Sequence, residues 1–113
     1  MNLENKTALI TGAGSGIGRA LARNLASQGC HLALVDIKKE DLEETADSII
    51  ESEIRISTHK VDVTDRPSLD VLLQDVIAAH KGLDVLINNA GIAAGGDFMQ
   101  LSEEAFNKVM DVN

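Results

Sequence analysis

The chain has few aromatic residues, one cysteine and no long apolar run, and each shortage excludes a class of protein. Its 113 residues include two Phe but no Trp or Tyr, so almost no side chain can stack on a nucleotide base. The single cysteine, Cys30, excludes an internal disulfide and any metal site built from several cysteines. No stretch approaches the roughly eighteen consecutive apolar residues of a membrane helix. We therefore expect no membrane partner and no need for an oxidising compartment.

Positive charge is also scarce. Ten Lys and Arg stand against eighteen Asp and Glu, which gives a formal net charge of −8. The basic residues are scattered, whereas a nucleic-acid-binding protein needs a basic face to neutralise phosphates. The first six residues lack the charged and then apolar run of a secretory signal. These features predict a soluble, cytoplasmic protein that binds no nucleic acid.

What the sequence does contain is an alternation of short apolar runs with segments of helical period. That alternation is typical of βαβ units and a parallel sheet. The first, second and fourth runs are apolar enough to be strands buried on both faces, and the more polar third run fits a strand at the sheet edge. The four predicted strands are Lys6–Thr11, His31–Asp36, Arg55–Val63 and Leu83–Asn88.

Three helices are predicted between these strands, and the start of a fourth follows them. The first carries an apolar stripe and ends at Gly29, and the second carries a similar stripe beside a solvated acidic face. The third runs from Asp65, its predicted cap, to about Lys81, with Pro67 in the first turn and Gly82 as its stop. The fourth begins at Ser102. The first two stripes consist of Ile17, Ala20, Leu21 and Leu25, and of Leu42, Ala46, Ile49 and Ile50.

The element order predicts an α/β fold with a Rossmann-type, doubly wound parallel sheet. Right-handed crossovers place the four strands in the spatial order 3-2-1-4, which is one half of such a fold plus the first strand of the other half. The fourth strand then has no partner on its outer edge, and a long apolar edge is usually covered. We therefore expect residues 1–113 to form a single, incomplete dinucleotide-binding domain.

A glycine-rich loop connects the first predicted strand to the first helix. It reads G-x-x-x-G-x-G from Gly12 to Gly18, with Ile17 where the common G-x-G-x-x-G pattern has its third glycine. Glycines at such a junction allow a sharp turn, close approach to a pyrophosphate, and tight packing of the helix on the sheet. No glycine is followed by the Lys and Ser or Thr of a P-loop. The pattern predicts a dinucleotide site.

Asp36 ends the second predicted strand, eighteen residues beyond Gly18. This is close to the interval at which an acidic residue meets the adenosine ribose of a bound dinucleotide. Its carboxylate would repel a 2′-phosphate, and neither Ser15 nor Ile37 offers a basic group, although Lys38 and Lys39 follow closely. Asp36 therefore favours NAD over NADP.

With these residues in view, the chain resembles the N-terminal part of a classical short-chain dehydrogenase/reductase. The likeness rests on TGAGSGIG at residues 11–18, Asp36, the Asp62–Val63 pair and NNAG at residues 88–91, and it extends over essentially the whole chain. It implies an NAD-dependent oxidoreductase that transfers a hydride between nicotinamide and a small carbonyl or secondary alcohol substrate. It also implies a homo-oligomer in the full-length form.

The resemblance further implies which residues bind NAD. The glycines would shape the pyrophosphate loop, Asp36 would hold the adenosine ribose, and Asp62 and Val63 would meet the adenine. The residues after the fourth strand would lie beside the ribose and phosphate portion, and the two Asn side chains would tie that strand end to its neighbours. The complete implied set is Gly12, Ser15, Gly16, Ile17, Gly18, Asp36, Ile37, Asp62, Val63, Asn89, Ala90 and Gly91.

Asn113 is the one candidate catalytic residue. In a helix it would share an apolar face with Phe106, Val109 and Met110, and a buried amide needs partners. The resemblance implies that it supports a proton relay through the family's catalytic lysine. The family's catalysis, however, also needs a tyrosine, and this chain has none.

Two hypotheses therefore remain open. The chain is either the cofactor-binding half of an oxidoreductase, inactive alone, or a complete short module that binds a dinucleotide or a protein without catalysis. No other chemistry is indicated, because His31, His59 and His80 lack ligand spacing and Cys30 has no base near it in the sequence. We expect structural or surface roles for these four residues and no metal site.

Overall fold

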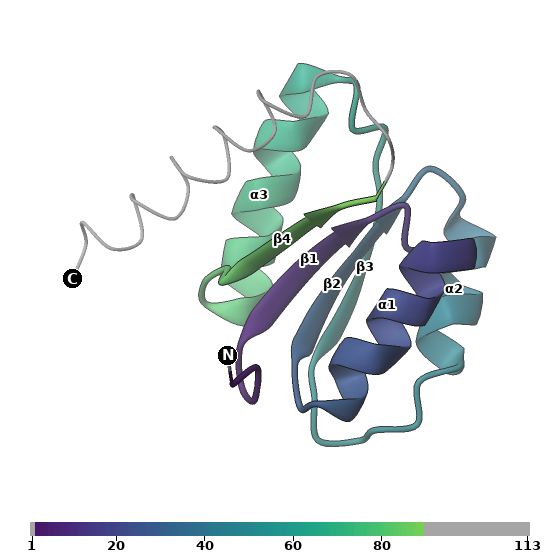
Figure 1. Ribbon diagram of the computed structural model, residues 1–113. Helices are drawn as coiled ribbons and strands as arrows, with labels where there is room; N and C mark the ends of the chain where they lie inside the picture. Colours follow the sequence, from purple (N-terminus) through teal and green to yellow (C-terminus); the bar gives the residue numbers. More distant parts are fainter. Residues whose placement is uncertain (1, 90–113) are drawn as a thin grey trace.

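The centre of the molecule is a parallel sheet of four strands in the order β3-β2-β1-β4 (Figure 1). This confirms the predicted order, which follows from right-handed crossovers. The structure is a computed structural model that describes residues 2–89, so the helix predicted from Ser102 lies outside the described residues. The elements are β1 (Thr7–Thr11), α1 (Gly16–Ser27), β2 (His31–Asp36), α2 (Lys39–Asp47), β3 (Ile56–Lys60), α3 (Arg66–His80) and β4 (Val85–Asn88).

Helices cover both faces of the sheet, with α1 and α2 on one side and α3 on the other (Figure 1). Successive strand residues point to opposite faces, so β1 and β2 supply two separate cores. Ile10 and Leu34 belong to the core beneath α1 and α2, whereas Leu9 and Val35 belong to the core beneath α3. All four side chains are fully buried, which explains the almost continuous apolar sequence of these strands.

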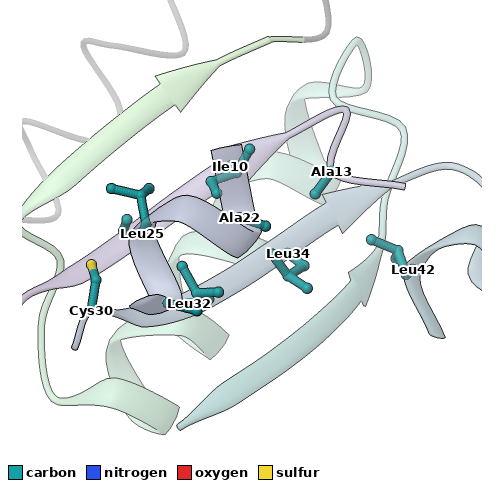
Figure 2. Close-up of a cluster of buried hydrophobic side chains, with 10 residues drawn as sticks. Ile10, Ala13, Ala22, Leu25, Cys30, Leu32, Leu34 and Leu42 are labelled. Atoms are coloured by element: carbon teal, nitrogen blue, oxygen red, sulfur yellow. The ribbon is translucent and has the colours of Figure 1, made fainter. Parts of the chain in front are cut away.

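Cys30 belongs to the first of these cores (Figure 2). It lies just before β2 and is completely buried, and its Sγ lies 3.3 Å from the backbone carbonyl oxygen of Lys6. Burial raises the pKa of the thiol, so the protonated form is favoured. Cys30 is therefore a small apolar core residue with a weak donor, in agreement with its predicted structural role.

Helical periodicity predicted that some apolar side chains of α1 and α2 are buried, but the structure exposes them. α2 ends at Asp47, so Ile49 and Ile50 are not part of its stripe; Ile49 packs partly on the core, but Ile50 is 89% exposed. The stripe predicted on α1 is also displaced, because its buried residues are Gly18, Ala22, Leu25 and Ala26, whereas Ala20 is exposed and Ile17 is 71% exposed. Periodicity reports only the direction of a side chain, not whether other elements lie beneath it.

The remaining boundaries differ from the predictions by a few residues. β3 covers only Ile56–Lys60, and β4 starts at Val85 rather than Leu83. Within the described residues β4 is half-buried at the edge of the sheet, not buried on both faces as predicted. Asp65 does lie at the cap position of α3, but its carboxylate accepts from the Ser68 hydroxyl and makes no capping bond to the backbone. Lys81, not Gly82, takes the left-handed conformation that ends α3, with φ of 62°.

No helix among residues 2–89 has both the length and the apolar character to cross a membrane.

Three histidines that are distant in sequence share a small polar cluster between β3, α3 and the start of β2. Oγ of Ser57 lies 2.7 Å from Nε2 of His59 and 2.7 Å from Nε2 of His80. Because Ser57 has one hydroxyl proton, at least one of these rings must donate its own Nε2–H. Nδ1 of His31 accepts the backbone N–H of Arg55 at 2.9 Å. The cluster gives these histidines the structural role expected of them, although their proximity was not predicted.

The cluster favours neutral imidazoles. Burial lowers the pKa of His80 to about 4, and the nearby Arg55, His31 and His59 act in the same direction. Burial also lowers the pKa of His59, against an opposing effect of Asp75, and burial together with Arg55 lowers the pKa of His31. Nδ1 of His80 is buried with no hydrogen-bond partner among the described residues, so a proton added there would be unsatisfied.

We expect the free energy of unfolding to fall as the pH is lowered from about 6.5 to about 4. The unfolded chain protonates His80 near its ordinary pKa of 6.5, whereas the folded chain resists protonation until about pH 4. Each unit of pKa difference corresponds to about 1.4 kcal/mol, and partial solvation of the cluster should reduce the total to about 2 kcal/mol. Urea unfolding at about pH 7, 5.5 and 4.5 measures this loss. His80→Gln keeps a donor for Ser57 but cannot be protonated, so an equal loss in this variant would contradict the assignment.

Candidate functional site

The glycine loop lies between the end of β1 and the start of α1, at the carboxyl edge of the sheet. Gly12 and Gly16 have φ of 65° and 60°, a left-handed conformation that residues with a side chain adopt at an energetic cost. Gly18 is needed for a different reason. A Cβ at this position would lie 2.0 Å from the carbonyl oxygen of Gly12, so only glycine allows α1 to pack this close to the loop.

Backbone hydrogen bonds attach the loop to the end of β2. The N–H of Ala13 donates to the carbonyl oxygen of Val35 at 3.0 Å, and the N–H of Gly14 donates to Oδ2 of Asp36 at 2.9 Å. A Cβ at Gly14 would lie 2.8 Å from the same carboxylate oxygen, so this glycine is also required by close contact. The loop is thus held by one backbone and one side-chain acceptor of the neighbouring strand.

The N-terminus of α1 lies at the solvent-exposed part of this loop. Ser15 occupies the cap position without a side-chain capping bond, and the first turn contains no acidic residue. The first N–H groups of a helix have no partner within the helix, and they carry the positive end of its dipole. Ser15, Gly16 and Ile17 are exposed, and a Cβ at Gly16 would meet nothing within 4 Å. This cradle of exposed donors and absent side chains fits a phosphate group.

Asp36 is a structural acceptor as well as a candidate ligand. Besides Gly14, its carboxylate accepts the N–H of Ile37 at 2.7 Å and that of Lys38 at 3.3 Å, both through Oδ1. A carboxylate has about four lone-pair positions, so it can accept a further hydrogen bond from a hydroxyl group. Ile37 is 57% exposed immediately beside it. Lys39 forms an exposed ion pair with Glu43 at 3.9 Å.

The amides at the end of β4 tie that strand to the loop. Oγ1 of Thr11 donates to Oδ1 of Asn88 at 2.9 Å, and Nδ2 of Asn89 lies 3.4 Å from the carbonyl oxygen of Gly12. These contacts confirm the prediction that the Asn side chains connect this strand end to its neighbours. The predicted residues Ala90, Gly91 and Asn113 lie outside the described residues.

Asp62 and Val63 do not end β3 as predicted, because that strand stops at Lys60. Asp62 is exposed, and hydrogen bonds from the hydroxyl and the backbone N–H of Thr64 lower the pKa of its carboxyl group. Val63 packs partly against the α3 core. The N–H of Val61 donates to the carbonyl oxygen of Asp36 at 3.0 Å, so this segment still follows the same edge of the sheet.

The predicted residues up to Asn89 therefore lie along one edge of the sheet, at or just after the carboxyl ends of its four parallel strands. That edge is where open α/β sheets bind ligands. Among residues 2–89, no group of three or more His, Cys, Asp or Glu side chains is arranged to hold a metal ion.

Two residues of the site were not predicted from the sequence, Arg19 on α1 and Thr45 on α2. Arg19 donates to the carbonyl oxygen of Gly14 and to Oγ1 of Thr45, and Thr45 donates to the carbonyl oxygen of Ala13. Thr45 lies three residues after Leu42 and so borders the apolar stripe of α2, whereas Arg19 is a single cation on α1. A threonine three residues after Leu42, at the spacing of a shared helix face, was the available signal.

Comparison with known proteins agrees with this geometry. The family model described as short chain dehydrogenase matches residues 6–113. The chain is 37% identical over 111 residues to 2,3-dihydro-2,3-dihydroxybenzoate dehydrogenase of Bacillus subtilis, covering 98% of this chain and 42% of that protein. It is 34% identical over 113 residues to the 3-oxoacyl-[acyl-carrier-protein] reductase FabG of Thermotoga maritima, covering all of this chain and 46% of that protein.

A solved structure shares the fold over almost the same range. NAD+-bound xylitol dehydrogenase superposes with a TM-score of 0.81 at 26% identity, over 97% of this chain and 50% of that one. The chain thus spans less than half the length of the two curated relatives and half the length of this structural neighbour.

We expect Gly18→Ala to disrupt the junction between β1 and α1. The added Cβ would overlap the carbonyl oxygen of Gly12 and lie 2.9 Å from Nδ2 of Asn89, so the helix must move. Overpacking of this kind typically costs about 1–3 kcal/mol. Gly16→Ala is the matched control, because its Cβ meets no atom and only its φ of 60° opposes the change. Urea unfolding of both variants measures the difference, and a Gly18→Ala variant as stable as the parent protein would show that the close packing is dispensable.

Proposed function

Because the chain belongs to the short chain dehydrogenase family, we propose that it binds NAD as the cofactor-binding half of an oxidoreductase. The reaction of the whole protein is hydride transfer between nicotinamide and a carbonyl or secondary alcohol. The observation that carries this proposal is the cradle formed by the glycine loop and the N-terminus of α1. Its exposed donors and missing side chains suit a pyrophosphate, and Asp36 lies where the loop meets the next strand.

The proposed roles follow the positions of the residues around this edge. The loop residues up to Gly18 take the pyrophosphate, Asp36 and Ile37 meet the adenosine ribose, and Asp62 and Val63 meet the adenine. Asn89, Ala90 and Gly91 follow the ribose and phosphate portion, and Asn113 supports the proton relay. When bound, NAD supplies the carbon that accepts or gives the hydride. The part of this chain at the sheet edge binds and orients the cofactor.

Charge at Asp36 supports NAD rather than NADP. A 2′-phosphate at the ribose would meet a carboxylate, and the neighbouring Ser15 and Ile37 carry no compensating positive charge. Lys39 is engaged with Glu43, although that exposed pair is weak. The xylitol dehydrogenase that shares this fold was solved with NAD+ bound, which supports the same choice.

We propose that residues outside this chain carry out the proton transfer that accompanies hydride transfer. A positioned acid or base contributes on the order of a hundred- to ten-thousandfold to rate, and the chain has no tyrosine. We propose that the whole protein acts on a small carbonyl or alcohol substrate and assembles as a homo-oligomer.

We expect Asp36→Ala to narrow the preference for NAD over NADP by about tenfold, which corresponds to about 1.4 kcal/mol. The change removes repulsion toward the 2′-phosphate together with the acceptor for the ribose. Calorimetric titration of the full-length protein with both cofactors measures it, and equal or tighter binding of NADP by the parent protein would refute the assignment. Asp36→Asn is the control, since it removes the charge but keeps an oxygen that can accept the N–H of Gly14.

We also expect residues 1–113 alone to show no turnover of secondary alcohols, because no group in the chain matches the family's tyrosine and lysine. An assay of NAD reduction, run beside the full-length protein on the same alcohols, tests this. Turnover by a fragment of verified mass would contradict the proposed division between a cofactor half and a catalytic half.

A further inference from the structure

We propose that Arg19 and Thr45 together position the glycine loop for pyrophosphate, through a chain of hydrogen bonds that joins α1, α2 and the loop. This inference rests on the proposed function, since it assigns how the same site is shaped. Neither residue would touch the cofactor. Both would act through the backbone of Ala13 and Gly14 and are therefore positioning residues.

Arg19 uses most of its donors inside the protein. Its Nε donates to Oγ1 of Thr45 at 2.9 Å, and its Nη2 donates to the carbonyl oxygen of Gly14. Nη1 pairs with Oε1 of the exposed Glu44 at 3.3 Å. The side chain is only 26% exposed, so the guanidinium lies between the two helices rather than in solvent.

Thr45 continues the chain of hydrogen bonds in one direction only. Its side chain is fully buried, and its hydroxyl donates to the carbonyl oxygen of Ala13 at 2.8 Å. A guanidinium cannot accept a hydrogen bond, so Arg19 must be the donor to Thr45. The direction of both hydrogen bonds is therefore fixed: Arg19 donates to Thr45, and Thr45 donates to the loop.

These contacts determine where the loop amides point. In a planar trans peptide the N–H is directed opposite to the carbonyl. Holding the carbonyl of Ala13 directs the N–H of Gly14 toward Asp36, where it forms its 2.9 Å bond. Holding the carbonyl of Gly14 likewise directs the N–H of Ser15 away from the guanidinium, at the cap position of α1.

The free protein thus already holds the loop in a defined shape. A loop that is ordered before binding does not lose that entropy when the ligand arrives, so affinity rises without a new contact. This gain in affinity should be confined to the part of the cofactor that contacts the loop. Loss of the Arg19–Thr45 contacts should therefore weaken ligands that contain a pyrophosphate and spare ligands that lack one.

The test compares ligands with and without a pyrophosphate in the full-length protein that contains this sequence. We expect Arg19→Met and Thr45→Val each to weaken the binding of NADH and of ADP about tenfold, while adenosine changes less than twofold. Thr45→Ser keeps the hydroxyl and should restore ADP binding. Arg23→Met is the matched control, because Arg23 is an exposed cation one turn further along α1 and should leave these affinities unchanged.

The outcomes separate this inference from the proposed function. Unchanged NADH and ADP affinity in both Arg19→Met and Thr45→Val would overturn the positioning role while leaving the cofactor assignment intact. An equal loss for ADP and adenosine would also overturn it, since that pattern indicates general destabilisation. A parent protein that binds neither NADH nor ADP would overturn the proposed function and, with it, the purpose of these contacts. Thermal unfolding of each variant establishes that binding is measured on folded protein.

Discussion

The contact between α1 and the carbonyl of Gly12 determines the arrangement of the rest of the site. With glycine at position 18, the helix packs so closely that a Cβ there would lie 2.0 Å from that oxygen. The same carbonyl lies 3.4 Å from Nδ2 of Asn89, so the ends of β1, β4 and α1 converge on one backbone group. The exposed N–H groups of the helix then face the edge at which all four strands end.

Asp36 matters to the loop both through its hydrogen bonds and through its charge. Its carboxylate accepts three backbone N–H groups, from Gly14, Ile37 and Lys38, and so holds the loop to the end of β2. The same charge would repel a 2′-phosphate. Under the proposed function, selectivity for the cofactor and the shape of the loop are therefore coupled through one side chain. Arg19 also holds the loop, from α1, because it donates to the carbonyl oxygen of Gly14.

The order of the strands could be predicted because it depends on information that a sequence carries locally. Apolar runs such as that of β2 identify buried strands, and right-handed crossovers reduce the possible arrangements to a few. The glycine loop was equally accessible, since Gly12 to Gly18 form a spacing with a direct steric meaning. The position of Asp36 relative to the loop followed from the same topology.

Contacts between helices could not be predicted in this way. The pairing of Arg19 with Thr45 depends on how α1 and α2 lie relative to each other, and no spacing within one helix reports the position of the other helix. The association of His59 with His80 through Ser57 has the same origin. Exposure of Ile50 shows the converse error, because periodicity continued past the residue at which the helix ends.

Because Cys30 is buried, the reactivity of its thiol can report when the surrounding core opens. The thiol is inaccessible in the native structure, and it lies in the core packed between α1 and the first two strands (Figure 2). A thiol-reactive reagent can therefore modify it only when this packing separates, and reactive thiolate forms readily only after that exposure. The rate of labelling under native conditions consequently measures how often the core beneath α1 opens.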